Sequence, residues 1–180
     1  RTGGGRDGLE ARIRAEIASH GNESLIKGLT GLLLRDGEET RRQAVRALGW
    51  VGTTDSVVPL LEALAEPFLA DTAAPALRGL GNSLVTEMLN ALQGVALPPD
   101  GLRRILELLG TATAPDIDRF MIQALEHEDG DVRQAAAAGL ANRAGREHLD
   151  ILVKTLGDCS VLVSGEAVRG LLRIAAASPA

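Results

Sequence analysis

The sequence contains very few aromatic side chains. Of its 180 residues 2% are aromatic, with no tyrosine, one tryptophan and two phenylalanines. A core without aromatic bulk must be filled by leucine, valine, isoleucine and alanine, which suit closely packed helices better than a β-sandwich or barrel. Strand-like alternation is also scarce. Because 45% of the residues are hydrophobic, the composition predicts a folded helical chain and excludes a disordered one.

Other features that the sequence lacks exclude several classes of protein. The one cysteine, Cys159, permits neither an internal disulfide nor a multi-cysteine metal site. No apolar run approaches the roughly 20 residues of a membrane-spanning helix, and no signal peptide is visible. We therefore expect a soluble, cytoplasmic domain with no membrane insertion within this chain, while an upstream anchor is not excluded. Residues 1–8 have the glycine-rich composition of a linker, so an excised domain of a larger protein is one interpretation.

Residues 41–64 predict two short helices joined by a tight turn. The first helix carries a stripe at helical spacing formed by Ala44, Val45 and Leu48. We expect Gly49 and Gly52 to end it, because glycine adopts the left-handed conformation without a Cβ penalty. Side-chain oxygens that could cap the next helix follow at Thr53, Thr54 and Asp55. The second helix has Pro59 in its first turn and an apolar stripe of Val57, Leu60, Leu61 and Leu64.

This unit recurs along the chain at intervals of about 31 residues, the signature of a helical repeat array. The first-helix anchors in register are Ile17, Leu48, Leu80, Leu109, Leu140 and Leu171. The second-helix anchors are Leu34, Leu64, Leu92, Leu125 and Leu156. We expect about five stacked hairpins and a terminal half-unit, in one repeat domain over residues 9–177. Pro75 should distort or delay the first helix predicted over residues 71–80, and Phe68 should precede that helix and staple it.

The residues of this pattern resemble a known family. Residues 131–137, Asp-Val-Arg-Gln-Ala-Ala-Ala, are followed by a turn and a leucine-rich helix and look like a HEAT repeat. Residues 54–64 carry the second-helix pattern of the same family, including its proline. The similarity is greatest to the short bacterial kind, called HEAT-like or phycobilisome-lyase-like repeats. It implies an all-α fold, a right-handed α–α superhelix (solenoid), with first helices on the convex side and second helices on the concave side.

Exposed positions of the second helices would then form a partner-binding surface on the concave side. Positions four apart are neighbours on a helix surface, so two columns should form one continuous polar stripe. The stripe consists of Val58, Glu62, Thr86, Asn90, Arg119, Gln123, Asp150 and Lys154. An ordinary solvated face is the alternative. Trp50, expected in the turn between helices, is either a partner anchor or a lid over its own turn.

The sequence offers no recognisable catalytic constellation. The histidines His20, His127 and His148 occur near helix ends in different units, where capping or helix-dipole effects account for them. No Gly-Lys-Ser/Thr motif follows the glycines of residues 3–5, so they are not a phosphate loop. The sequence therefore predicts a binding protein that is not an enzyme and that uses no metal and no cofactor.

The leading hypothesis is a non-catalytic scaffold or adaptor that binds a protein partner of unknown identity. The alternatives are a regulatory module of a larger, membrane-anchored or soluble protein, a chaperone related to chromophore lyases, and nucleic-acid binding. The last is disfavoured, because the net charge is −5 and aromatic residues are nearly absent. The C-terminal half-unit lacks a partner helix in the repeat pattern, which suggests self-association with another copy.

Overall fold

The computed structural model describes residues 23–35, 37–114 and 116–177, and every regular element in these ranges is helical. They contain ten α-helices, α2 to α11, and three short 3-10 helices, η1 to η3. The predicted all-α helical-repeat class is confirmed. The helix predicted at residues 9–19 and the linker-like residues 1–8 lie outside the described residues. The chain divides into two compact units, Arg1–Ala96 and Leu97–Ala180, and the single repeat domain over residues 9–177 stays a prediction.

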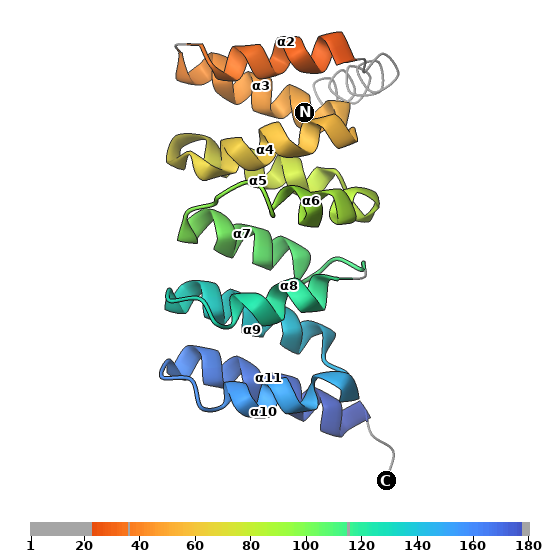
Figure 1. Cartoon of the computed structure of the whole chain (residues 1–180), viewed down its shortest axis with the longest axis vertical. Helices are drawn as coiled ribbons and strands as arrows, with labels where there is room; N and C mark the ends of the chain where they lie inside the picture. Colours follow the sequence, from red (N-terminus) through yellow and green to blue (C-terminus); the bar gives the residue numbers. More distant parts are fainter. Residues whose placement is uncertain (1–22, 36, 115, 178–180) are drawn as a thin grey trace, which may run out of the picture. The chain divides into compact units, whose positions relative to one another are not determined.

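The first unit is built from helices that pack side by side (Figure 1). They are α2 (Glu23–Leu33), α3 (Glu38–Val51), α4 (Val57–Ala65), α5 (Pro67–Gly79) and α6 (Val85–Ala91). The 3-10 helices η1 (Thr54–Ser56) and η2 (Asn82–Leu84) lead directly into α4 and α6. First helices α3 and α5 pack on each other, while second helix α4 packs on α5 and on α6. This is the arrangement expected of stacked helical hairpins.

The second unit repeats the arrangement. Its α-helices are α7 (Pro99–Leu109), α8 (Ile117–Ala124), α9 (Gly130–Arg143), α10 (Leu149–Thr155) and α11 (Val161–Ala177), and η3 (Arg146–His148) precedes α10. First helices α7, α9 and α11 pack in that order, and second helices α8 and α10 pack on α9 and α11. In Figure 1, α8 and α10 lie in front of α9 and α11. In this unit each second helix therefore covers the first helix that follows it along the chain.

The leucine register marks the core in both units. The first-helix anchors Leu48, Leu80, Leu109 and Leu140 are buried, and so is the second-helix anchor Leu64. Two predicted second-helix anchors are wrong, because Leu34 is 88% exposed and Leu156 is 41% exposed. Helix α2 ends at Leu33, so Leu33 faces the core and Leu34 falls in the following turn. Leu156 lies just after α10, on the last hairpin of its unit.

The two glycines expected to end α3 have different roles. Gly52 ends the helix as predicted: it has the left-handed conformation (φ 63°), and its N–H donates to the Leu48 carbonyl at 3.2 Å. Gly49 lies inside α3, so its prediction as a helix end is wrong. A Cβ atom at Gly49 would lie 2.7 Å from the Cβ atom of Ala76 on α5. Gly49 is therefore required by the close approach of two helices.

Three further local predictions are wrong. Helix α5 begins earlier than expected, because Pro67 occupies its first position, where the missing N–H costs nothing. It continues through Pro75, whose ring is exposed, and it includes the half-buried Phe68, whose ring stacks under Arg41 at 4.5 Å. The residues after Gly52 do not cap α4 with their side chains, because η1 intervenes between them and that helix.

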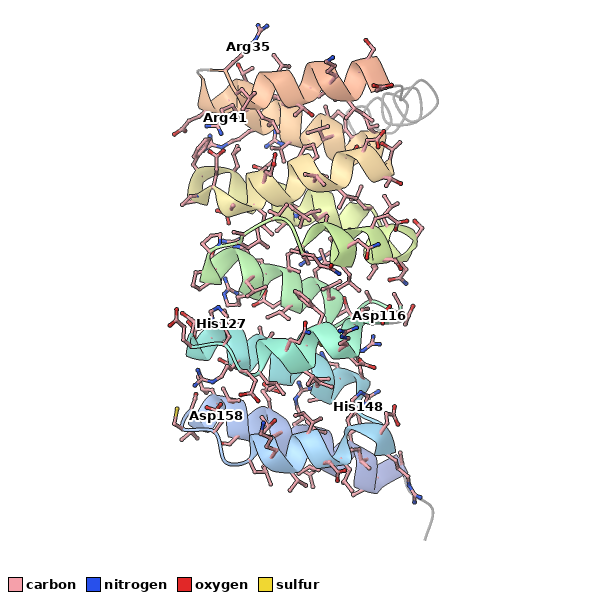
Figure 2. The ribbon with its side chains drawn as sticks, viewed as in Figure 1. Arg35, Arg41, Asp116, His127, His148 and Asp158 are labelled. Carbon is pink, nitrogen blue, oxygen red and sulfur yellow. The ribbon has the colours of Figure 1, made fainter. Side chains whose placement is uncertain are left out.

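Two ion pairs, each spanning 25 residues, connect a first helix to the segment that leads into the next one. Arg41 on α3 binds Glu66, just before α5, at 2.5 Å. Arg133 on α9 binds Asp158, ahead of α11, at 2.8 Å, and it also donates to the carbonyls of His127 and Glu128. Figure 2 shows His127 and Asp158 at the same end of the second unit. The hydrogen bond from Arg133 lowers the pKa of Asp158 below its usual value.

Candidate protein-binding surface

In the first unit, the predicted columns lie on α4 and α6, which pack on each other. Val58 and Glu62 are exposed on α4, and Thr86 and Asn90 are exposed on α6. Within each helix the two side chains are one turn apart and therefore neighbours on the surface. The structure thus brings these four residues to adjacent helices and leaves them accessible. Their role in binding and their place on a concave side stay predictions.

In the second unit, the columns lie on α8 and α10. The exposed members are Arg119, Gln123, Asp150 and Lys154. Two contacts hold α8 and α10 next to each other: Lys154 Nζ binds Glu126 Oε1 at 2.7 Å near one end, and His148 Nε2 lies 3.3 Å from Asp118 Oδ2 near the other. All eight residues predicted for the surface are therefore exposed, four in each unit.

The prediction that the stripe is continuously polar is wrong in the second unit. Large apolar side chains are exposed beside the polar columns, at Ile122, Leu149 and Val153. Each directly precedes a polar member of a column. The corresponding positions of the first unit, such as Leu61 before Glu62, are buried. The repeat register alone assigns all of these positions to the core, so only the structure reveals that the second unit exposes them.

Trp50 lies inside α3 and not in a turn, so its predicted position is wrong. Its half-buried indole lines a pocket of 480 Å³ between α3 and α5. The other lining residues are Arg46, Gly49, Asp71, Thr72, Pro75, Ala76 and Gly79. The pocket thus combines an aromatic ring, a cation and a carboxylate between two first helices. It belongs to a different layer of the unit from Glu62 and Asn90.

His148 is the buried centre of a polar network in the second unit. The Gly145 N–H donates to His148 Nδ1 at 3.1 Å, so the imidazole caps η3, as expected of a histidine near a helix end. With Nδ1 accepting, the ring proton is on Nε2, which faces Asp118. Arg143 Nε donates to Asp118 Oδ1 at 2.5 Å, and Arg143 also donates to the Ala112 carbonyl. Figure 2 shows His148 and Asp116 at the same end of the unit, opposite the end that carries Asp158.

This network sets the charge of Asp118. Burial alone raises the pKa of Asp118, but the hydrogen bond and the charge of Arg143, aided by His148, outweigh burial and lower that pKa overall. Asp118 therefore stays ionised under ordinary conditions. Because Nδ1 of His148 is occupied by a backbone amide, the imidazole is not placed as a general base, and the network serves to join α8, α9 and α10.

The second helices of the described residues expose charges, amides and aliphatic groups. In this part of the chain no three His, Cys, Asp or Glu side chains converge as a metal site requires. The exposed Cys159 has its Sγ 3.5 Å from Arg133. No helix in the described ranges is long and apolar enough to cross a membrane.

Comparison with known families agrees with the architecture. The profile of HEAT repeats matches residues 117–180, which cover α8 to α11. The described helices that precede residue 117 also form pairs that recur at intervals of about 31 residues, so the helical organisation is the same there. The match includes residues 131–137, so the resemblance of that segment to a HEAT repeat is confirmed within residues 117–180.

Individual relatives are similar at low identity. The chain is 28% identical over 150 residues to the phycocyanobilin lyase subunit alpha of Picosynechococcus sp., covering 76% of this chain and 56% of the relative. It thus spans little more than half of that protein. Among solved structures it is similar to an engineered protein (TM-score 0.48, 21% identity, 86% of this chain and 80% of that chain). It is also similar to the complex of CpcE and CpcF of phycocyanin lyase from Nostoc sp. PCC7120 (TM-score 0.42, 22% identity, 89% and 66%).

Proposed function

We propose that this chain is a non-catalytic scaffold that binds a partner protein through the exposed faces of its second helices. The observation that carries the proposal is the exposure of all eight column residues. Four of them lie on α4 and α6, which pack on each other, and four lie on α8 and α10, whose ends are joined by the Lys154–Glu126 and His148–Asp118 contacts. In the second unit, aliphatic groups at Ile122 and Val153 lie among charges at Arg119 and Lys154. A mixture of apolar contact and flanking polar groups is the usual composition of a protein interface.

Charge reversal at one residue of each unit tests this proposal. We expect the double variant Glu62→Arg and Asp150→Arg to lose at least about tenfold of its affinity for the partner, since opposite-charge contacts become repulsive. The measurement is quantitative capture from an extract of the source cells, with the tagged 180-residue chain as bait. Arg78→Glu, a reversal on first helix α5, is the matched control and should retain the partner. Equal capture by the double variant would place binding elsewhere.

A second candidate function, related to chromophore lyases, is supported by the pocket at Trp50 together with the name of the relative. Phycocyanobilin is a conjugated tetrapyrrole with carboxylate side chains. Arg46 is placed to bind a carboxylate, Asp71 is a potential acceptor for pyrrole N–H groups, and Trp50 offers a ring for stacking. The chain would then hold the chromophore while a partner protein accepts it.

The single tryptophan makes this second proposal measurable. We expect phycocyanobilin to quench Trp50 fluorescence saturably, because the only indole of the chain lines the pocket. Arg46→Glu should weaken binding about tenfold or more, the effect of replacing a charge-assisted contact with a repulsive one. The control is Arg78→Glu on α5, which does not line the pocket. Quenching that rises without saturation, or equally in both variants, would exclude a site here.

A further inference from the structure

A pocket of 480 Å³ lies in the second unit, near the ends of three first helices. We call it the arginine pocket. Its lining residues are Gly110, Thr111, Ala112 and Thr113 in the turn after α7, Asn142 and Arg143 at the end of α9, and Arg173 one turn before the end of α11. Figure 1 shows these three segments at the same end of the unit. A volume of a few hundred Å³ is typical of a site for a small ligand.

The charge that lines the arginine pocket has one sign. It comes from the guanidinium groups of Arg143 and Arg173, and no carboxylate is among the described lining residues. The pocket at Trp50 differs, because Arg46 and Asp71 both line it. Arg173 is exposed and makes no ion pair with any residue in the described ranges. An anion in the arginine pocket would therefore be attracted by two cations.

Arg143 occupies a position that most other repeats fill with an apolar residue. It lies three residues after the anchor Leu140. The equivalent residues of the other described first helices are Val51, Ser83, Ala112 and Ile174. Three of these four are apolar and buried. Because an arginine in the same place must give up part of the hydration of its charge, core packing does not account for Arg143.

Two contacts fix the Arg143 guanidinium beside the pocket. Its Nε donates to Asp118 Oδ1 at 2.5 Å, and its Nη1 donates to the Ala112 carbonyl. A guanidinium has five N–H groups, and Nη2 has no acceptor among the described residues although it is not buried. Asp118 offsets part of the Arg143 charge. The remaining N–H groups are already held in place, so a ligand that binds them pays little for ordering the side chain.

Asn142 supplies further donors. Arg169 Nη1 donates to Asn142 Oδ1 at 2.7 Å. Because arginine carries only donors, the amide atom that faces it must be the oxygen, and the NH2 group of Asn142 points the other way. Arg169 itself is occupied by Glu166 at 2.6 Å and by the Ala138 carbonyl. Since Asn142 is exposed and lines the pocket, its two N–H groups are accessible to a ligand there.

The carbonyl groups beside the pocket oppose an anion only weakly. The end of a helix is negative because its last carbonyls lack partners. Here the Leu108 carbonyl accepts from Thr111 Oγ1 at 2.9 Å, and the Ala112 carbonyl accepts from Arg143. These donors reduce the negative potential at the turn after α7. The charge of Arg173 is left without a counterpart in the part of the unit that the structure describes.

From these observations we propose that the arginine pocket binds the phosphate group of a small phosphorylated ligand. The phosphate oxygens would accept from Arg143 and Asn142 on α9 and from Arg173 on α11. A phosphate monoester carries about 1.5 to 2 negative charges at neutral pH, which suits two cations better than the single charge of a carboxylate. None of the lining residues belongs to the eight columns or to the pocket at Trp50, so failure of either proposed function would not affect this proposal.

Titration of the isotope-labelled 180-residue chain with inorganic phosphate, at constant ionic strength, tests the proposal. We expect the NMR signals of the Asn142 side-chain NH2 and of Arg143 Nε–H to shift and to saturate. Arg173→Gln should weaken binding at least about tenfold, the effect of losing one charge-assisted contact. Arg146→Gln is the matched control, because it removes another exposed arginine of the same unit that does not line the pocket, and it should bind phosphate normally.

Asn142→Asp provides a second variant whose fold is expected to persist. The new carboxylate has nearly the same size and still accepts from Arg169, so thermal unfolding followed by circular dichroism should change little. It replaces two donors with negative oxygens and should abolish phosphate binding. Asn90→Asp on α6 adds the same charge away from the pocket and should bind normally.

Four results would overturn the proposal. The first is a wild-type chain whose signals do not shift saturably with phosphate. The second and third are binding unchanged by Arg173→Gln or by Asn142→Asp. The fourth is acetate that binds as tightly as phosphate at the same ionic strength, since the pocket would then not distinguish the two anions by charge.

Discussion

Replacing Gly49 by leucine is expected to destabilise the first unit by about 3 kcal/mol, at the upper end of the usual cost of overpacking. Even a methyl group at this position would lie 2.7 Å from Ala76 Cβ and 3.1 Å from its backbone Cα. The obstacle is the α5 backbone, which cannot rotate away as a long side chain would. Helices α3 and α5 must therefore separate, and the apolar residues between them, including Leu48 and Leu77, lose contact. The measurement is the free energy of unfolding in urea, followed by far-ultraviolet circular dichroism.

Gly28→Leu is the matched control for this prediction. Gly28 lies in the interior of α2, and a Cβ atom there has nothing within 4 Å. The same substitution should be neutral or stabilise by up to about 1 kcal/mol, the difference in helix propensity between glycine and leucine. If Gly49→Leu proved as harmless as Gly28→Leu, the close approach of α3 and α5 would not exist in solution.

Removing the Asp118 carboxylate is expected to cost about 2 kcal/mol at pH 7, because the Arg143 guanidinium and the buried His148 N–H both lose their acceptor. We expect no larger cost in stability because the Asp118 side chain is 39% exposed, so water can replace part of the lost hydrogen bonding. The variant to compare is Asp118→Ala, with unfolding measured in urea from pH 7 down to pH 2.

The pH dependence supplies the control for this second prediction. Since the pKa of Asp118 is lowered in the folded chain, its contribution is fully present above the unfolded pKa of about 3.9 and is lost as the pH falls through the folded value. The difference between wild type and variant should therefore be constant from pH 7 to about pH 5 and shrink towards zero in stronger acid. Asp131→Ala, on the exposed start of α9, should show little difference at any pH. A difference between wild type and Asp118→Ala that persisted at pH 2 would assign the loss to packing.

The helical repeat could be predicted from the sequence because it rests on periodicity. Leucines such as Leu48, Leu109 and Leu140 recur at nearly constant spacing, and burial of one face imposes that spacing. Helix ends that depend on a glycine conformation, as at Gly52, were equally predictable. The eight column residues were placed on exposed positions correctly, because the side opposite a buried stripe must face solvent.

The features that could not be predicted depend on contacts between residues that are distant in the sequence. The neighbouring sequence does not distinguish Gly49 from a glycine that ends a helix. Its role depends on another helix, because it leaves room for Ala76 of α5. The same is true of Trp50, whose position inside α3 follows from the continuation of the helix past Gly49. His148 was expected only as a cap, since its contact with Asp118 joins residues 30 positions apart. The exposure of Leu149 and Val153 likewise depends on which helices pack against α10, and the repeat pattern alone does not reveal this.

The ion pairs Arg41–Glu66 and Arg133–Asp158 also bear on how the chain folds. Each closes a loop of only 25 residues, and the helix contacts join elements that are first or second neighbours along the chain. Short loops close quickly and at low entropic cost, so such a chain can nucleate at any hairpin and grow outward. Hydrogen exchange should then reveal hairpins that open separately, with protection differing from one to the next.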